Sequence, residues 1–299
     1  MGVKMMFEFP TGMPQMCGGL TQQIDNNAPK TIKSRDLVFF SAESSFRTLA
    51  SNCAVNEEYA WIDFISVYAV KLDKGSFLFL NARDAYEKSE IGFAYVKTDI
   101  FPKLADMIEG AGFAGRNGVY RFINGLPQNF GGEVRAEYAS GEKLGFSDNQ
   151  TPVFSKAFGI ELYALFSEAM KAERLPLPDA EKIIGVKFYE KHSSGYSSAQ
   201  LKGNPDGSYT LTRAYKFEEP ELFEHTKEAG TEVIEKIRKT AASCAVLIWD
   251  KFPKRELPSI IQKSLTFIMS DGSEITVSDD RNLPLPLSGA FFTIERELV

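Results

Sequence analysis

Acidic and amide side chains recur at two matched places in the chain, where their oxygens are suited to a cation or a sugar. Ser147-Asp148-Asn149 ends one predicted hairpin, and Ser278-Asp279-Asp280 ends another. The same residue types also end strands by hydrogen-bonding their own backbone, so a turn role is the alternative. A calcium loop needs oxygen ligands at alternate positions around a glycine, and the sequence lacks that pattern here. The binding candidates are therefore Asp148, Asn149, Asp279 and Asp280.

A serine and a lysine three residues apart form a second candidate. Ser140 and Lys143, followed by Ser147-Asp148-Asn149, have the residue types of three elements found in penicillin-interacting enzymes. In those enzymes the serine begins a helix and the Ser-Asp-Asn element lies on a distant loop. Here all of them fall on one predicted hairpin, and the second copy has Glu274 in place of the lysine. The pattern therefore favours a turn over a nucleophile.

The histidines and cysteines are too few and too scattered to predict a metal or catalytic site. His225 and Glu221 are four residues apart and share a face of a predicted helix, but zinc needs three or four ligands. Cys17 has glycine neighbours, yet no base can be named for it. The glycine-rich run 110–115 follows a predicted helix, whereas a dinucleotide site opens one. We predict no catalytic residue, no metal and no cofactor.

Charge and composition limit the partners. The chain has 299 residues and a formal net charge of −6, and its longest basic stretch, Lys251 to Arg255, is interrupted by Phe252 and Pro253. Nucleic acid is therefore not expected as the main partner. No apolar run approaches the length that spans a bilayer, and three scattered cysteines fit a reducing cytoplasm. We predict a cytoplasmic protein with a protein or small-molecule partner and no membrane.

We interpret two parts of the sequence as copies of an internal repeat, and the candidate residues lie at matched places in the two copies. Ser140 to Asn149 lines up with Asp271 to Asp280, and Lys74 to Phe77 lines up with Asp206 to Tyr209. A repeat of this length implies two similar modules, each large enough to bury a core.

In the first module, β-branched and aromatic runs predict strands, and apolar residues at i, i+3, i+4 and i+7 predict helices. Gly75 and Gly141 suit hairpin turns. The expected strands are 37–40, 61–70, 77–80, 91–95 and 119–123, followed by a hairpin over 133–147. Two helices are expected, one that begins near residue 102 and one that covers 162–170.

In the second module, Asp206-Gly207 predicts a turn, and residues 264–278 predict a hairpin around Gly272. An apolar stripe from Leu222 to Ala241 predicts one long helix after Pro220. The apolar run 245–249 predicts a strand. The helix at 162–170 is expected to have no counterpart, because few residues follow the last hairpin.

The predicted fold class is α+β: a tandem duplication of two modules, each a mostly antiparallel sheet covered by one long helix. We expect an irregular arm over 1–36, a first module over 37–175 and a second over 176–299. The predicted function is a non-catalytic binding or scaffold protein that uses the inter-module surface or the paired hairpin ends. The alternative is an enzyme whose active site lies in the cleft between the modules.

Overall fold

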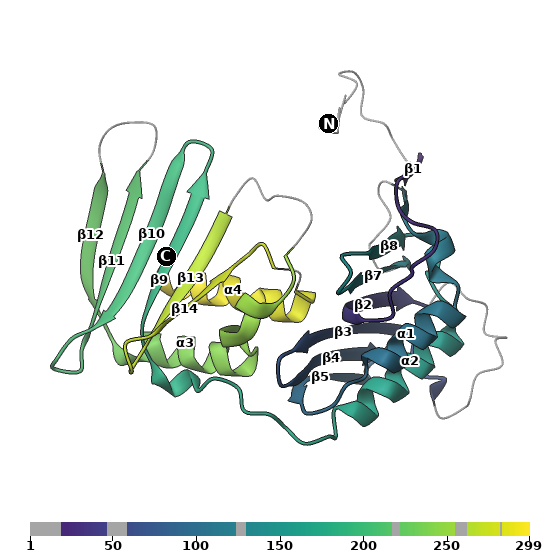
Figure 1. Ribbon diagram of the computed structural model, residues 1–299. Coiled ribbons are helices and arrows are strands. Elements are labelled where there is room, and N and C mark those ends of the chain that lie inside the picture. The colour runs from purple at the N-terminus through teal and green to yellow at the C-terminus, as the bar shows by residue number, and fades with distance from the viewer. Residues whose placement is uncertain (1–18, 47–58, 124–129, 217–221, 255–261, 282) are drawn as a thin grey trace.

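The computed structural model describes residues 19–46, 59–123, 130–216, 222–254, 262–281 and 283–299. Within these ranges the chain forms two large β-sheets with few helices, a mixed α+β fold (Figure 1). The strand pairs are antiparallel apart from β6 with β8, as expected for strands joined mainly by hairpins. In the described ranges, no helix is both long enough and apolar enough to traverse a bilayer.

The first sheet has eight strands in the order β1-β6-β8-β7-β2-β3-β4-β5. Its strands are β1 (Leu20–Ile24), β2 (Leu37–Ser45), β3 (Phe64–Leu72), β4 (Gly75–Arg83), β5 (Ser89–Val96), β6 (Val119–Ile123), β7 (Gly132–Tyr138) and β8 (Lys143–Asp148). β1 lies in the segment that the sequence predicts to be irregular, and it pairs with β6.

One face of this sheet is covered by α1 (Phe101–Gly110) and α2 (Lys156–Ala169). α1 buries Leu104 and Ile108, the stripe predicted from the sequence. α2 begins where the Ser155 hydroxyl accepts a hydrogen bond from the Phe158 amide at 3.2 Å. Both helices were predicted from the sequence, so two helices of 10 and 14 residues cover the sheet instead of the one long helix of the predicted fold class. We call each sheet with its helices a module.

The second sheet has six strands in the order β12-β11-β10-β9-β13-β14. Its strands are β9 (Ile183–His192), β10 (Gly195–Gly203), β11 (Tyr209–Lys216), β12 (Phe223–Ala229), β13 (Gln262–Met269) and β14 (Glu274–Ser278). Three of the predicted turn glycines are confirmed: Gly141, Gly207 and Gly272 have a positive φ, between 82° and 86°, whereas Gly75 begins β4 without one.

The long helix predicted after Pro220 was wrong. Residues 223–229 form strand β12, and only Thr231–Ser243 is helical (α3). Leu222 and Ala229 lie seven residues apart, which is the spacing of two helical turns. Here the two residues have that spacing by chance, because a strand lies between them. Gly230 separates the two elements as the N-cap residue of α3. His225 therefore lies on a strand and does not share a helix face with Glu221, which falls outside the described residues.

The strand predicted over 245–249 was also wrong. Val246–Lys251 forms a 3₁₀ helix, η5, entered through Ala245 at φ 51°. A short apolar run fits a buried helical turn as well as a buried strand. Trp249 in this segment is fully buried, and its indole N–H donates to the Cys244 carbonyl at 3.1 Å.

The second module does contain a counterpart of the helix at 162–170, so the prediction that it has none was wrong. α4 (Leu285–Leu298) has 14 residues, as α2 has, and it follows the β13–β14 hairpin as α2 follows β7–β8. α3 and α4 pack together on one face of the six-stranded sheet.

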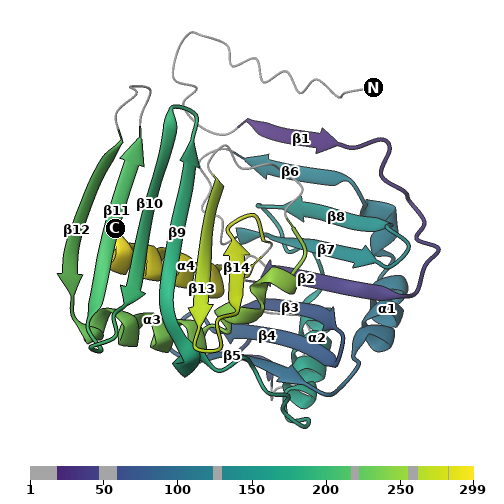
Figure 2. The same cartoon turned by 60° about the vertical axis from the view of Figure 1, so that its left-hand side comes forward.

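The two modules share one hydrophobic cluster. Phe252, directly after η5, contacts Tyr68 and Phe77 of the first sheet, with ring centroids 5.7 and 4.9 Å apart. In both views the sheets lie beside each other, with the segment around η5 between them (Figures 1 and 2). The first sheet therefore has helices on one face and the second module on the other, which we call its inner face.

Candidate functional site

A hollow of about 380 Å³ lies on the inner face, at the border between the modules. β2, β3, β4 and β7 form its floor, and Leu283 and Pro284 of the second module form part of its wall. We call it the inter-module hollow. Its polar lining consists of Ser41, Glu43, Ser66, Tyr68, Asn81, Arg83, Glu133 and Arg135.

Strand alternation explains why these side chains converge. Residues two apart on a strand share a face, and Glu43 lies opposite both Ser66 on β3 and Glu133 on β7. Along β2 the inner face changes from Phe39 to Ser41 and Glu43, and along β4 from Phe79 to Asn81 and Arg83. The apolar half packs under the second module, and the polar half lines the hollow.

Three residues that line the hollow each have a buried polar atom without a hydrogen-bond partner in the described part of the chain. They are Tyr68 Oη, Asn81 Oδ1 and Arg83 Nε. Tyr68 is only 2% exposed, and a buried polar group without a partner costs about 1–3 kcal/mol. Buried polar groups are nearly always satisfied, so these atoms need a partner, which ordered water or a bound molecule can supply.

The charges of the hollow form one satisfied pair and one unsatisfied pair. Arg135 Nε donates to Glu133 Oε1 at 2.6 Å. Arg83 stacks over the Phe64 ring at 4.5 Å but has no carboxylate within ion-pair distance among the described residues. Burial raises the pKa of Glu43, and the charge of Glu133 adds to the effect, while Arg135 and Arg83 oppose it. Burial likewise raises the pKa of Tyr68 well above its usual value, with a smaller contribution from Glu137.

Glu43→Gln is expected to stabilise the protein near neutral pH. A raised pKa in the folded state favours the protonated carboxyl, so the stability that Glu43 contributes is present at acid pH and lost as the pH rises through its folded pKa. Glutamine has no carboxyl group to ionise, so the variant does not lose this stability as the pH rises. Urea unfolding at about pH 4 and about pH 7 should show the gain only at the higher pH. The exposed control Glu228→Gln should show no such difference, and an equal gain at both pH values would contradict the buried charge.

A second hollow, of about 340 Å³, lies between residues 30–35 and α1. Three of its charged groups are paired: Lys30 Nζ donates to the Asn117 carbonyl, Arg35 bonds to Asp106, and Glu109 lies 3.7 Å from Arg35. None of its described lining atoms is buried without a partner. It therefore gives no comparable sign of a ligand.

Asp148 and Asn149 lie at the end of β8 and bond to nearby backbone. Asp148 Oδ1 accepts from the Gln150 and Thr151 amides at 2.8 and 3.2 Å. The Asn149 side chain bonds to both the amide and the carbonyl of Ile123, at 2.8 and 3.0 Å. Hydrogen bonds of this kind to backbone fit the alternative role, in which these residues end strands.

Asp279 and Asp280 follow β14 and also bond within their own module. Asp279 Oδ1 accepts from the Lys263 amide at 3.1 Å, and the Asp280 carboxylate lies 3.3 Å from Lys254 Nζ. Asp280 has a lowered pKa, since burial, which raises it, is outweighed by hydrogen bonds from Ser278 and Lys254. The two predicted pairs lie in different sheets, and neither contributes to the lining of the inter-module hollow.

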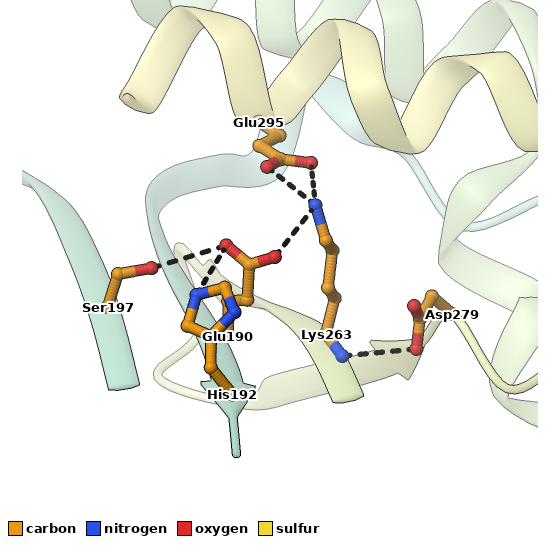
Figure 3. A network of polar contacts seen from close by, with 6 residues as sticks. All are labelled: Glu190, His192, Ser197, Lys263, Asp279 and Glu295. Carbon is orange, nitrogen blue, oxygen red and sulfur yellow. Dashed lines mark hydrogen bonds and ion pairs between the residues drawn. The ribbon is translucent and has the colours of Figure 1, made fainter. Parts of the chain in front are cut away.

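Asp279 adjoins a polar network that fastens α4 to the second sheet (Figure 3). Lys263 Nζ bonds to Glu190 Oε1 at 3.1 Å and to both Glu295 oxygens at 2.8 and 3.0 Å. Glu190 Oε2 also accepts from Ser197 and lies 3.4 Å from His192 Nε2. Burial lowers the pKa of Lys263, but the hydrogen bonds to Glu295 and Glu190 outweigh it and the net shift is upward.

Lys263→Met is expected to lower the free energy of unfolding by about 2 kcal/mol, because it leaves Glu190 and Glu295 without their shared cation. Both carboxylates are mostly shielded, with side-chain exposures of 13% and 17%. Urea denaturation at neutral pH measures the loss. Lys202→Met, on the exposed face of β10, is the matched control, and equal losses in the two variants would contradict a role for the network.

The described residues contain no group of three or more His, Cys, Asp or Glu side chains that converge as metal ligands. The hollow's residues escaped the sequence analysis because they are far apart in the chain. One sequence signal could have indicated them: polar residues at strand positions where an apolar core residue is expected, as in Phe39-x-Ser41-x-Glu43.

Comparison with known proteins leaves the family open. No protein-family model and no curated protein matches the chain. Among solved structures, it is similar to the DNA polymerase III beta subunit of Thermotoga maritima, with 12% identity over 86% of this chain and 61% of that chain and a TM-score of 0.12. The beta subunit from Pseudomonas aeruginosa gives 10% identity over 87% and 60%, with a TM-score of 0.13. The chain spans about three fifths of the length of these structures, and TM-scores this low support no conclusion about function.

Proposed function

We propose that this chain is a cytoplasmic, non-catalytic binding protein that holds a small polar ligand in the inter-module hollow. The observation that carries the proposal is the set of unpartnered buried atoms, Tyr68 Oη, Asn81 Oδ1 and Arg83 Nε, around one cavity. A volume of about 380 Å³ falls at the lower end of the roughly 300–1,000 Å³ of small-molecule sites.

The proposal includes an origin of the fold by duplication. The recurring order of a hairpin followed by a 14-residue helix, β7–β8–α2 and β13–β14–α4, supports it together with the matched turns at Gly141 and Gly272. A hollow at the junction of two related modules is a common place for a ligand, since neither module alone closes it.

Thermal unfolding against a panel of amino acids, dipeptides, organic acids, sugars and nucleotides tests the function. A ligand that binds only the native state raises its melting temperature. Ser66→Phe places a ring in the centre of the hollow, and Ser198→Phe places the same ring on the open face of β10. We expect a panel member to stabilise the wild type and Ser198→Phe but not Ser66→Phe. Equal stabilisation of all three, or of none, would contradict a site in the hollow.

A second candidate function is an enzyme whose site is the same hollow. The raised pKa of Glu43, beside the second carboxylate Glu133, favours it, because a half-buried carboxyl that holds its proton more strongly than usual is suited to general acid–base catalysis. Incubation of the wild type with each stabilising ligand, followed by mass spectrometry, distinguishes the two. Turnover that Glu43→Gln abolishes would establish the enzyme, and an unchanged ligand supports the binding protein.

A further inference from the structure

We propose that the ligand of the inter-module hollow is a small zwitterion that carries an apolar group, with its anionic end on Arg83 and its ammonium on Glu43. The inference rests on the proposed function and names the class of ligand. It follows from the charge balance, the unmet hydrogen bonds and the apolar wall of the hollow.

Charge balance sets the first requirement. The hollow holds two acidic and two basic side chains, and Arg135 and Glu133 already bond to each other at 2.6 Å. Glu43 and Arg83 remain, with no ion pair or hydrogen bond from either side chain to another described residue. An anion would satisfy only Arg83 and a cation only Glu43, so only a ligand with both charges satisfies both.

The strand register keeps the backbones of these two residues apart, although the charge of Arg83 still acts on the Glu43 carboxyl. Glu43 lies on β2 and Arg83 on β4, with β3 between them. Strands spaced by roughly 4.8 Å place β2 and β4 about 10 Å apart. Ser66 lies between them, opposite both Glu43 and Asn81. A ligand over Ser66 therefore has a carboxylate on one side and a guanidinium on the other.

The unpartnered atoms set a second requirement. Arg83 Nε can only donate, so it needs an acceptor, as a ligand carboxylate provides. Asn81 Oδ1 can only accept, and it lies on β4 beside Arg83, so it needs a donor such as an N–H or O–H group near the anionic end of the ligand. Tyr68 Oη can do either. The hollow thus requires a donor and an acceptor on one molecule.

The wall of the hollow supplies the apolar requirement. Phe64, Leu283 and Pro284 line it, and Phe64 is stacked against the Arg83 guanidinium at 4.5 Å. Contact with these three groups favours a ligand with an aliphatic side chain over a purely polar one.

Calorimetric titration of the full chain with L-leucine and with L-leucyl-L-leucine tests the inference. Both probes are zwitterions with aliphatic side chains, and they differ in the distance between their charges. We expect at least one of them to bind with a stoichiometry of one. L-Leucinamide, which lacks the carboxylate, and N-acetyl-L-leucine, which lacks the ammonium, should bind roughly tenfold to a hundredfold more weakly, as expected for a lost charged hydrogen bond.

Two variants assign the ends of the probe. Arg83→Gln should weaken the zwitterion by roughly tenfold or more while leaving L-leucinamide unchanged, and Glu43→Gln should do the same with N-acetyl-L-leucine as the unchanged probe. The exposed control Arg121→Gln should bind as the wild type does. Undiminished binding of a singly charged analogue, or no binding of either zwitterion, would overturn the inference. If another panel member binds and Ser66→Phe blocks it, the proposed function still stands and only the ligand class is wrong.

Discussion

Phe252→Ala is expected to lower the free energy of unfolding by about 3–5 kcal/mol, the cost of truncating a fully buried aromatic side chain. Phe252 is 1% exposed and packs against Tyr68 and Phe77 of the other module. Because this ring joins the two modules, its loss should also separate their unfolding. Urea denaturation followed by both tryptophan fluorescence and circular dichroism measures both effects.

The matched control is Phe292→Ala, because Phe292 is 64% exposed. A loss within about 0.5 kcal/mol is expected there, as at other surface positions. Coincident transitions and a loss as small as that of the control would contradict Phe252 as the joint between the modules.

Gly132→Ala is expected to cost about 3 kcal/mol and to abolish ligand binding in the hollow. A Cβ on Gly132 would lie 1.9 Å from the Glu43 carbonyl oxygen, far inside any real contact. The clash is with backbone, which cannot move aside as a flexible side chain can, so the cost falls at the upper end of overpacking. β2 and β7 would have to separate at the point where they place Glu43 and Glu133.

Gly110→Ala is the control for this substitution. Gly110 ends α1, and an added Cβ would meet nothing within 4 Å. Its replacement should leave stability unchanged or raise it by about 0.5–1 kcal/mol. If chemical denaturation and calorimetry show Gly132→Ala to be as stable and as competent in binding as Gly110→Ala, the close approach of β2 to β7 is refuted.

The parts of the fold that could be predicted are those with local signals. The hairpins around Gly141 and Gly272 need a positive φ at one residue, and glycine after Ser or Asp marks that position. α1 and α2 carry apolar stripes long enough to set a helical period. The antiparallel α+β character follows from the excess of hairpins.

The parts that could not be predicted depend on tertiary contacts. β12 has charged residues on both faces and is exposed along almost its whole length, so its pattern does not distinguish strand from helix. The first four residues of η5, 246–249, are all apolar because the core surrounds them, and they show neither the period of a strand nor that of a helix.

The candidate site could not be predicted from the sequence, because it also depends on tertiary contacts. Glu43, Asn81 and Arg83 become neighbours only through the pairing of β2, β3 and β4. The inter-module surface could be proposed in outline, since two modules imply a junction. The paired hairpin ends were predicted because they repeat, but Asp148 bonds to the backbone just after β8 and Asn149 bonds to the end of β6.

A crystal structure of the full chain with the ligand that the thermal panel identifies tests the central claim most directly. The account predicts ligand density in the inter-module hollow, within hydrogen-bond distance of Tyr68 Oη, Asn81 Oδ1 and Arg83 Nε. Density at another site, with these three atoms left as they are or satisfied by neighbouring protein groups, would contradict it.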